Sequence, residues 1–98
     1  MAYEIIWMPK ANAKFISICE YIESEWSERI ARNFASDVYR MLDLLKIFPE
    51  IGSIEQKRKN IRGLVITKQT TLFYTIKEKK VILLTFFDTR QHPSRRFE

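Results

Sequence analysis

The chain has 98 residues, of which 46% are hydrophobic and 30% are charged. This composition excludes a disordered chain and predicts one globular domain over residues 1–98. No apolar run approaches the about 20 residues of a membrane helix, and no basic region precedes the short apolar stretch at the N-terminus, so we expect neither a membrane span nor a secretory signal. The single cysteine cannot form an internal disulfide, which favours a cytoplasmic protein.

The net charge of +5 is concentrated in the second half of the chain. Residues 1–50 contain six Lys or Arg and eight Asp or Glu, a balance of −2, whereas residues 51–98 contain eleven and four, a balance of +7. We therefore expect a positive potential around the second half, which could attract a polyanion or an acidic protein. A solubilising surface with lysines on edge strands explains the same composition equally well.

The first half of the chain predicts one strand followed by two helices. Residues 3–7 are β-branched and aromatic, and Pro9 ends this strand and suits the first turn of a helix. Residues 10–26 repeat apolar side chains at steps of three and four, and Ser27 offers an N-cap for a second helix that ends near Phe48. Two helices joined so closely form an antiparallel hairpin that packs on a sheet. The positions expected to be buried are Ala11, Phe15, Ile18 and Ile22, then Trp26 at the corner, then Ile30, Phe34, Val38, Met41, Leu42 and Leu45.

The second half predicts a polar connector followed by three strands. The connector covers residues 50–60, and the strands cover about 61–68, 70–76 and 81–87. The last strand is apolar on both faces, which is typical of a central strand. The order β-α-α-β-β-β predicts an α+β fold in which a helical hairpin packs on one face of a mostly antiparallel sheet.

Candidate chemistry is limited to a cluster of cationic residues. One histidine, one cysteine and two glycines leave no set for a metal site or a phosphate loop, so we expect neither metal nor cofactor. His92 could transfer a proton while Arg62 and Arg90 stabilise phosphate charge, a metal-free set for cleaving RNA, which supplies its own 2′-OH nucleophile. Equally, His92 could be a solvated tail residue, and Arg62 a sheet-edge charge paired with a carboxylate. The residues that could contact a substrate or target are Lys57, Arg58, Lys59, Arg62, Arg90, Arg95 and Arg96.

Several segments of the sequence accompany this order of elements. These are WMPKANAKFISICEYI, then FPEIG after the second helix, then IRGLVI and LFYTIKEKKVILLTFFDTRQHP. Together they resemble the RelE/ParE superfamily, the toxins of type II toxin–antitoxin modules, over nearly the whole chain. The resemblance implies a cytoplasmic bacterial toxin of the plasmid-stabilisation type. It also implies an antitoxin partner from the same operon, which we expect to have an acidic C-terminal half.

One branch of the superfamily, the RelE-like branch, cleaves mRNA in the ribosomal A site. Its basic residues before and on the first strand of the meander resemble residues 57–59 and Arg62. This chain departs from that branch at Thr71, where the branch places an arginine, and at Phe97, where it often supplies a tyrosine. His92 keeps a metal-free mRNA endonuclease as an alternative, because some nucleases of the family rely on a histidine in this tail.

The other branch, the ParE-like branch, inhibits DNA gyrase by binding and needs no proton-transfer set. Its long paired helices and its arginine motif after the last strand resemble residues 10–48 and DTRQHP. We favour this branch. On this interpretation Arg90, Arg95 and Arg96 contact gyrase or its bound DNA. A third alternative is a decayed toxin that retains only antitoxin binding.

Overall fold

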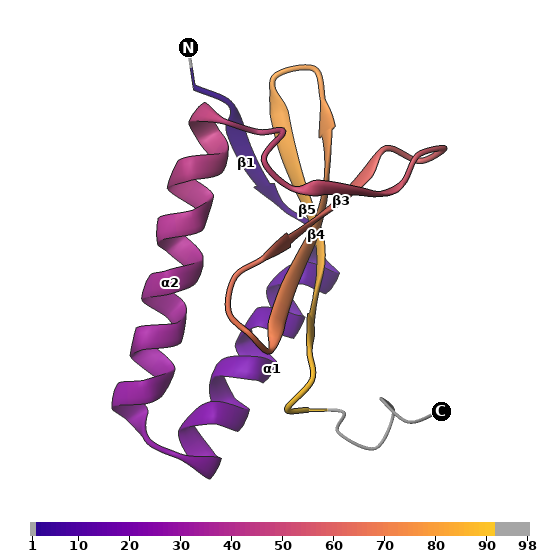
Figure 1. The fold of residues 1–98 in the computed structure, drawn as a ribbon. Coiled ribbons are helices and arrows are strands. Elements are labelled where there is room, and N and C mark those ends of the chain that lie inside the picture. The colour runs from indigo at the N-terminus through magenta and orange to yellow at the C-terminus, as the bar shows by residue number, and fades with distance from the viewer. Residues whose placement is uncertain (1, 92–98) are drawn as a thin grey trace.

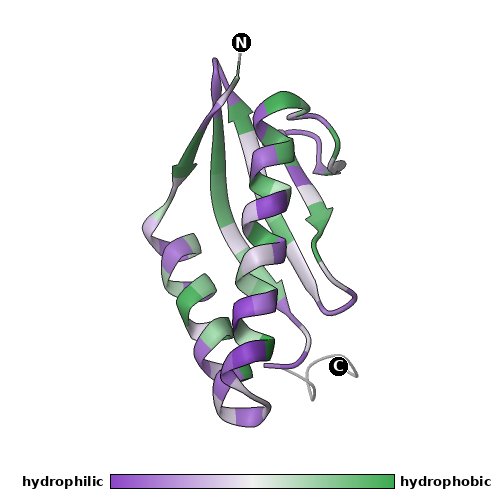
Figure 2. Cartoon of the chain, turned by 90° about the vertical axis from the view of Figure 1, so that its left-hand side faces the viewer, coloured by the Kyte–Doolittle hydropathy of each residue, from purple (hydrophilic) through white to green (hydrophobic). Residues whose placement is uncertain are grey.

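The computed structural model describes residues 2–91 as two layers, a sheet with a helical hairpin on one of its faces (Figure 1). The sheet order is β1-β5-β4-β3-β2, with β1 parallel to β5 and the other pairs antiparallel. Figure 2 shows both helices in front of the same face of the sheet. The predicted α+β class and its helical hairpin are therefore confirmed. The elements are β1 (Glu4–Trp7), α1 (Pro9–Glu25), α2 (Glu28–Ile47), β2 (Ser53–Gln56), β3 (Ile61–Val65), β4 (Thr70–Lys77) and β5 (Lys80–Asp88).

The helices begin where the sequence predicts. Pro9 is the first residue of α1, and the Oγ of Ser27 caps α2 by accepting a hydrogen bond from the backbone N–H of Ile30 at 3.1 Å. The predicted burial of Ile30 is wrong, because Ala31 takes the inward position in the first turn. Trp26 is also largely exposed. Both residues lie at the corner of the hairpin, which extends past the ends of the strands (Figure 1).

A fifth strand, β2, lies inside the segment predicted to be a connector. Ser53 pairs with Gly63 and Ile54 pairs with Arg62, so β2 forms an edge of the sheet beside β3. All four residues of β2 are exposed. The strand therefore lacks the alternation of buried and exposed positions by which a sequence predicts a half-buried strand, and the expectation of a simple connector was wrong here.

The core lies between the helices and the inward face of the sheet. Its largest contacts are between aromatic rings, with centroid distances of 5.4 Å for Trp7–Phe15, 6.1 Å for Phe15–Phe34 and 5.9 Å for Trp7–Phe86. These residues come from β1, α1, α2 and β5. Aromatic packing thus joins both helices to two neighbouring strands.

The central strand β5 contains a bulge that sets which of its residues face the helices. The register between β4 and β5 shifts by one residue, and Leu84 is the extra residue. Leu83 and Phe86 are both buried, whereas Phe87 is exposed. Strict alternation from Leu83 would instead have buried Thr85 and Phe87. The bulge therefore places the ring of Phe86 in the core.

The loop between α2 and β2, residues 49–52, is fixed to the sheet by Tyr74 of β4. The Tyr74 hydroxyl donates to the carbonyl of Pro49 at 2.7 Å and accepts from the backbone N–H of Gly52 at 2.9 Å. Burial raises the pKa of Tyr74, so its hydroxyl stays protonated and can donate. A Cβ on Gly52 would lie 2.7 Å from the Tyr74 hydroxyl and 2.9 Å from the carbonyl of Gly63, so only glycine fits here.

The substitution Tyr74→Phe tests this contact. It leaves the buried Gly52 N–H and the Pro49 carbonyl without their partner, and we expect the free energy of unfolding to fall by about 1–3 kcal/mol in urea denaturation. Tyr39→Phe is the matched control, because Tyr39 is 53% exposed and its loss of the same atom should change stability by no more than about 0.5 kcal/mol. Equal, small effects of the two substitutions would show that the Tyr74 hydroxyl does not hold the loop.

Candidate functional site

Arg62, one of the predicted catalytic and target-binding residues, adds a second contact to the same loop. Arg62 lies on β3 opposite Tyr74. Its Nη1 donates to the carbonyl of Glu50 at 3.1 Å and to the carbonyl of Gly52 at 2.8 Å. The acceptors of Arg62 are thus backbone carbonyls and not the carboxylate that one interpretation predicted. We call the contacts of Tyr74 and Arg62 with residues 49–52 the loop clamp.

Arg90, the second predicted arginine, is paired with a buried carboxylate. Asp88 is 0% exposed, and Arg90 donates to it from Nη2 at 2.7 Å, from Nε at 3.0 Å and from the backbone N–H at 2.8 Å. The hydroxyl of Thr70 donates to the same carboxylate. The guanidinium also lies over the ring of Phe34, 5.7 Å from its centroid. We call Thr70, Asp88 and Arg90 the buried ion-pair cluster.

The cluster stabilises the end of the described chain at neutral pH. Burial acts to raise the pKa of Asp88, but hydrogen bonds from Arg90 and Thr70 outweigh burial, and the pKa lies below its ordinary value. The ionised form is therefore favoured in the folded state. Its contribution to stability is present above the unfolded-state pKa and is lost as the pH falls through the folded-state pKa. Next to the cluster, Gln91 Nε2 donates to Ser17 Oγ of α1 at 2.8 Å.

The structure places the two arginines apart. Arg62 lies opposite Tyr74, whereas the cluster of Arg90 lies where Thr70 pairs with Asp88. Thr70 and Tyr74 are four positions apart on β4, which corresponds to about 13 Å along an antiparallel strand.

Three predicted residues, His92, Arg95 and Arg96, lie outside the described residues. The catalytic trio of His92, Arg62 and Arg90 and the target contacts of Arg90, Arg95 and Arg96 remain predictions.

The three other predicted target-binding residues lie together at one end of the sheet. Lys57, Arg58 and Lys59 are exposed in the turn between β2 and β3. Because Ile61 pairs with Thr75 near the end of β4, the turn between β4 and β5 lies at the same end of the strands. In Figure 1 the two turns project from that end in different directions. Three lysines lie in or beside this second turn, and the sequence did not group them with the first set. The order of the hairpins could have grouped them, because alternate turns of consecutive antiparallel strands lie at the same end. The basic end, as we call it, consists of Lys57, Arg58, Lys59, Lys77, Lys79 and Lys80.

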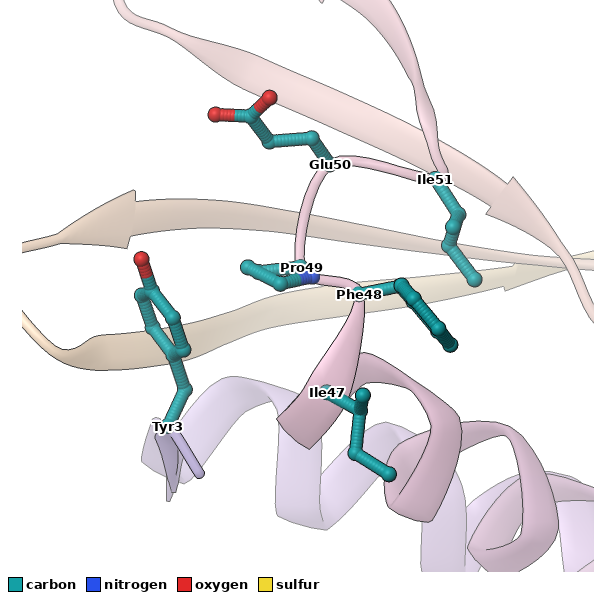
Figure 3. Close-up of a pocket in the computed structure, with 6 residues that line it drawn as sticks. All are labelled: Tyr3, Ile47, Phe48, Pro49, Glu50 and Ile51. Atoms are coloured by element: carbon teal, nitrogen blue, oxygen red, sulfur yellow. The ribbon is translucent and has the colours of Figure 1, made fainter. Parts of the chain in front are cut away.

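An apolar hollow that the sequence did not predict lies at the end of α2. Tyr3 and residues 47–51 line it. Figure 3 shows Ile47, Phe48 and Ile51 directed to the same side. Their exposed fractions are 65%, 55% and 41%. A second hollow, lined by Met41 and Leu44, shares Ile47 with the first. Apolar residues recur at steps of three and four from Met41 to Ile51. This spacing indicates a second apolar face that begins on α2 and continues past its end, and it could have predicted the hollow. We call Met41, Leu44, Ile47, Phe48 and Ile51 the apolar row.

Other chemistry has little support in the described residues. Burial, followed by the charge of Glu20, raises the pKa of the Cys19 thiol, which disfavours the reactive thiolate. Within residues 2–91 no group of three His, Cys, Asp or Glu is arranged to hold a metal ion. In the same part of the chain, none of the helices is long and apolar enough to cross a membrane.

Two of three comparisons with known proteins find matches. A family model described as ParE toxin of type II toxin–antitoxin system, parDE, matches residues 5–93. A search of curated protein sequences finds no match. The fold is similar to that of a chain from the chromosomal ParDE TA system of P. aeruginosa, with a TM-score of 0.74 and 15% identity, covering 89% of this chain and 96% of that one.

Two further solved structures share the fold. One is a chain from the toxin–antitoxin complex RelBE2 of Mycobacterium tuberculosis, with a TM-score of 0.62 and 15% identity, covering 90% of this chain and 99% of that one. The other is a copper-bound mutant toxin from Helicobacter pylori, with a TM-score of 0.56 and 14% identity, covering 92% and 98%.

The substitution Arg90→Gln tests the buried ion-pair cluster. It leaves the carboxylate of Asp88 buried without its cation, and we expect a loss of about 3 kcal/mol or more in the free energy of unfolding. Arg32→Gln is the matched control, because the Arg32–Glu28 pair is exposed on α2 and an exposed pair contributes at most about 1 kcal/mol. If Arg90→Gln cost no more than the control, the cluster would not stabilise the fold. If it costs the expected amount, reduced toxicity of an Arg90 variant reports on folding before it reports on target binding.

Proposed function

Because the chain belongs to the ParE toxin family of type II toxin–antitoxin systems, we propose that it arrests bacterial growth by binding and inhibiting DNA gyrase. The observation that carries this proposal is the family match over residues 5–93, which extends from β1 to the residues after β5. The shared fold with a chain of a ParDE system supports the same family.

The contacts of the two arginines favour inhibition by binding over RNA cleavage. Proton-transfer catalysis on RNA would need Arg62 and Arg90 to act on one phosphate together with His92. Arg62 is instead bound to loop carbonyls and Arg90 to a buried carboxylate. Inhibition by binding requires no such assembly. Arg90 then acts by fixing residues 88–91, and contacts of Arg95 and Arg96 with the target remain part of the proposal.

A cognate antitoxin with an acidic C-terminal half neutralises the toxin by direct binding. The apolar row offers exposed apolar side chains beside two adjoining hollows, on which the apolar face of an amphipathic helix can pack. The net charge of +5 favours association with an acidic partner. A chain of similar fold has been solved within a toxin–antitoxin complex.

A supercoiling assay with purified protein tests the proposed target. We expect the toxin to block supercoiling of relaxed plasmid by gyrase, and an equimolar amount of the protein encoded by the adjacent gene to restore it. Ribosome-bound mRNA, incubated in parallel, should stay intact. Codon-phased mRNA cuts with gyrase unaffected would establish the RelE-like activity instead. Antitoxin binding without either effect would indicate a decayed toxin.

Binding measurements on surface variants test the antitoxin site. Ile47→Asp places a charge in the centre of the apolar row, and we expect the Kd for the antitoxin to rise by about tenfold or more, equivalent to about 1.4 kcal/mol. Ile30→Asp, at the other exposed end of the same helix, should change the Kd by less than about threefold. Unchanged affinity in the folded Ile47→Asp protein would remove the apolar row from the interface.

A further inference from the structure

The basic end has no carboxylate partners in the described structure, unlike Arg32, Arg40 and Lys46 of α2. The ion pairs present among residues 2–91 are Arg32–Glu28, Arg40–Asp37 and Lys46–Asp43 on α2, together with the buried pair of Arg90 and Asp88. None of them includes a residue of the basic end. Six of the eleven cations that the sequence places in its second half are therefore available to an external anion at this end.

Backbone and side-chain contacts hold the turn between β2 and β3 in place. Asn60, which adopts a left-handed conformation with a φ of 55°, donates from Nδ2 to the carbonyl of Ile76 at 3.4 Å. Its own carbonyl accepts a hydrogen bond from the Thr75 hydroxyl at 2.8 Å. The turn is thus attached to the end of β4, directly before the second cationic turn. The two turns are positioned relative to each other by the sheet and not by flexible loops.

The second turn contributes its lysines in a similarly ordered way. Lys77 and Lys80 are directly opposite each other in the register of β4 and β5. Lys79 lies over the ring of Tyr3, with its Nζ 5.0 Å from the ring centroid. Glu78 between them adopts a φ of 59°, which closes the tight turn. The result is a set of cations held at two points on one end of a rigid sheet.

We propose that the basic end binds the phosphate backbone of duplex DNA. This inference rests on the proposed function and deepens it, because gyrase acts on duplex DNA and a toxin that contacts both would bind the enzyme–DNA complex. A duplex carries one negative charge per about 1.7 Å of its axis, so two separated cationic turns can be neutralised at once. No base-specific contact is required, and the binding is independent of sequence.

The composition of the basic end distinguishes duplex DNA from two other anionic partners. Single-stranded nucleic acid is bound by stacking bases on aromatic side chains. The exposed aromatic residues of the described chain are Trp26, Tyr39, Phe48 and Phe87, and none lies in the two turns. An acidic peptide needs apolar surface on which to fold, and the end of β2 and the first turn, residues 55–60, offer polar side chains only.

The test is fluorescence anisotropy of the isolated toxin with a labelled duplex of about 20 base pairs and arbitrary sequence, measured between about 50 and 200 mM salt. We expect log K to fall linearly with log salt. The variant Lys57→Gln/Arg58→Gln/Lys59→Gln should bind about tenfold more weakly or worse at low salt. Its salt slope should be smaller by about 0.9 for each phosphate that the variant no longer neutralises. Asn60 is left unchanged, so that the turn keeps its anchor.

The matched control is Lys10→Gln/Arg29→Gln/Arg32→Gln, which removes the same net charge from exposed positions on the helices. It should weaken DNA binding by less than about threefold and leave the salt slope unchanged. Equal effects of the two triple variants would mean that only net charge matters and would overturn the proposal. So would an undetectable affinity for the duplex, or tighter binding of a single strand of the same length.

The DNA measurement contains no gyrase, so its failure is distinguishable from failure of the proposed function. If wild-type toxin inhibits gyrase without binding duplex DNA, the proposed function stands and the DNA-binding site is rejected. If the duplex is bound through the basic end but gyrase is unaffected, the DNA-binding site stands and the target is wrong.

Discussion

The structure depends on the way the turn from α2 into the sheet satisfies its buried backbone groups. A buried N–H or C=O without a partner costs about 1–3 kcal/mol, and the loop clamp provides partners for the buried Gly52 N–H and for the part-buried carbonyls of Pro49 and Gly52. Arg62 also donates to the exposed carbonyl of Glu50. Because Tyr74 and Arg62 hold this loop against the sheet, the following residues are placed to pair with β3 as β2. The same loop presents Ile51 to the apolar row, so the clamp shapes both proposed binding surfaces.

Cationic residues of the second half are therefore used in two different ways. Arg62 and Arg90 donate to acceptors of their own chain. The basic end keeps its charge exposed and holds it at fixed positions. If every cation were assigned to catalysis, these two groups would form one site. The contacts of Arg62 and Arg90 with their own chain instead separate them from the basic end. Inhibition by binding does not require the two groups to act together, and the apolar row is a separate surface on which a partner can bind.

Patterns of local residues predicted most of the fold. The helices, the cap at Ser27 and the central position of β5 all depend on periodicity or on neighbouring residues, and the structure agrees with the sequence on each. The edge strand β2 carries no periodic signal, and the bulge at Leu84 depends on pairing with β4. The sequence identified Arg62 and Arg90 as candidates. It could not show their acceptors, because carbonyls of a loop and a carboxylate at a strand end meet them only in the folded chain.

Native-state hydrogen exchange of the Gly52 amide is the most direct test of the loop clamp. The account predicts that this amide exchanges as slowly as the amides of β4 and β5, because its release from Tyr74 requires the sheet and the loop to separate. Exchange of Gly52 at the rate of a free surface loop, while the amides of β4 and β5 remain protected, would contradict the account. The loop would then be mobile, and the apolar row and β2 would need another explanation for their position.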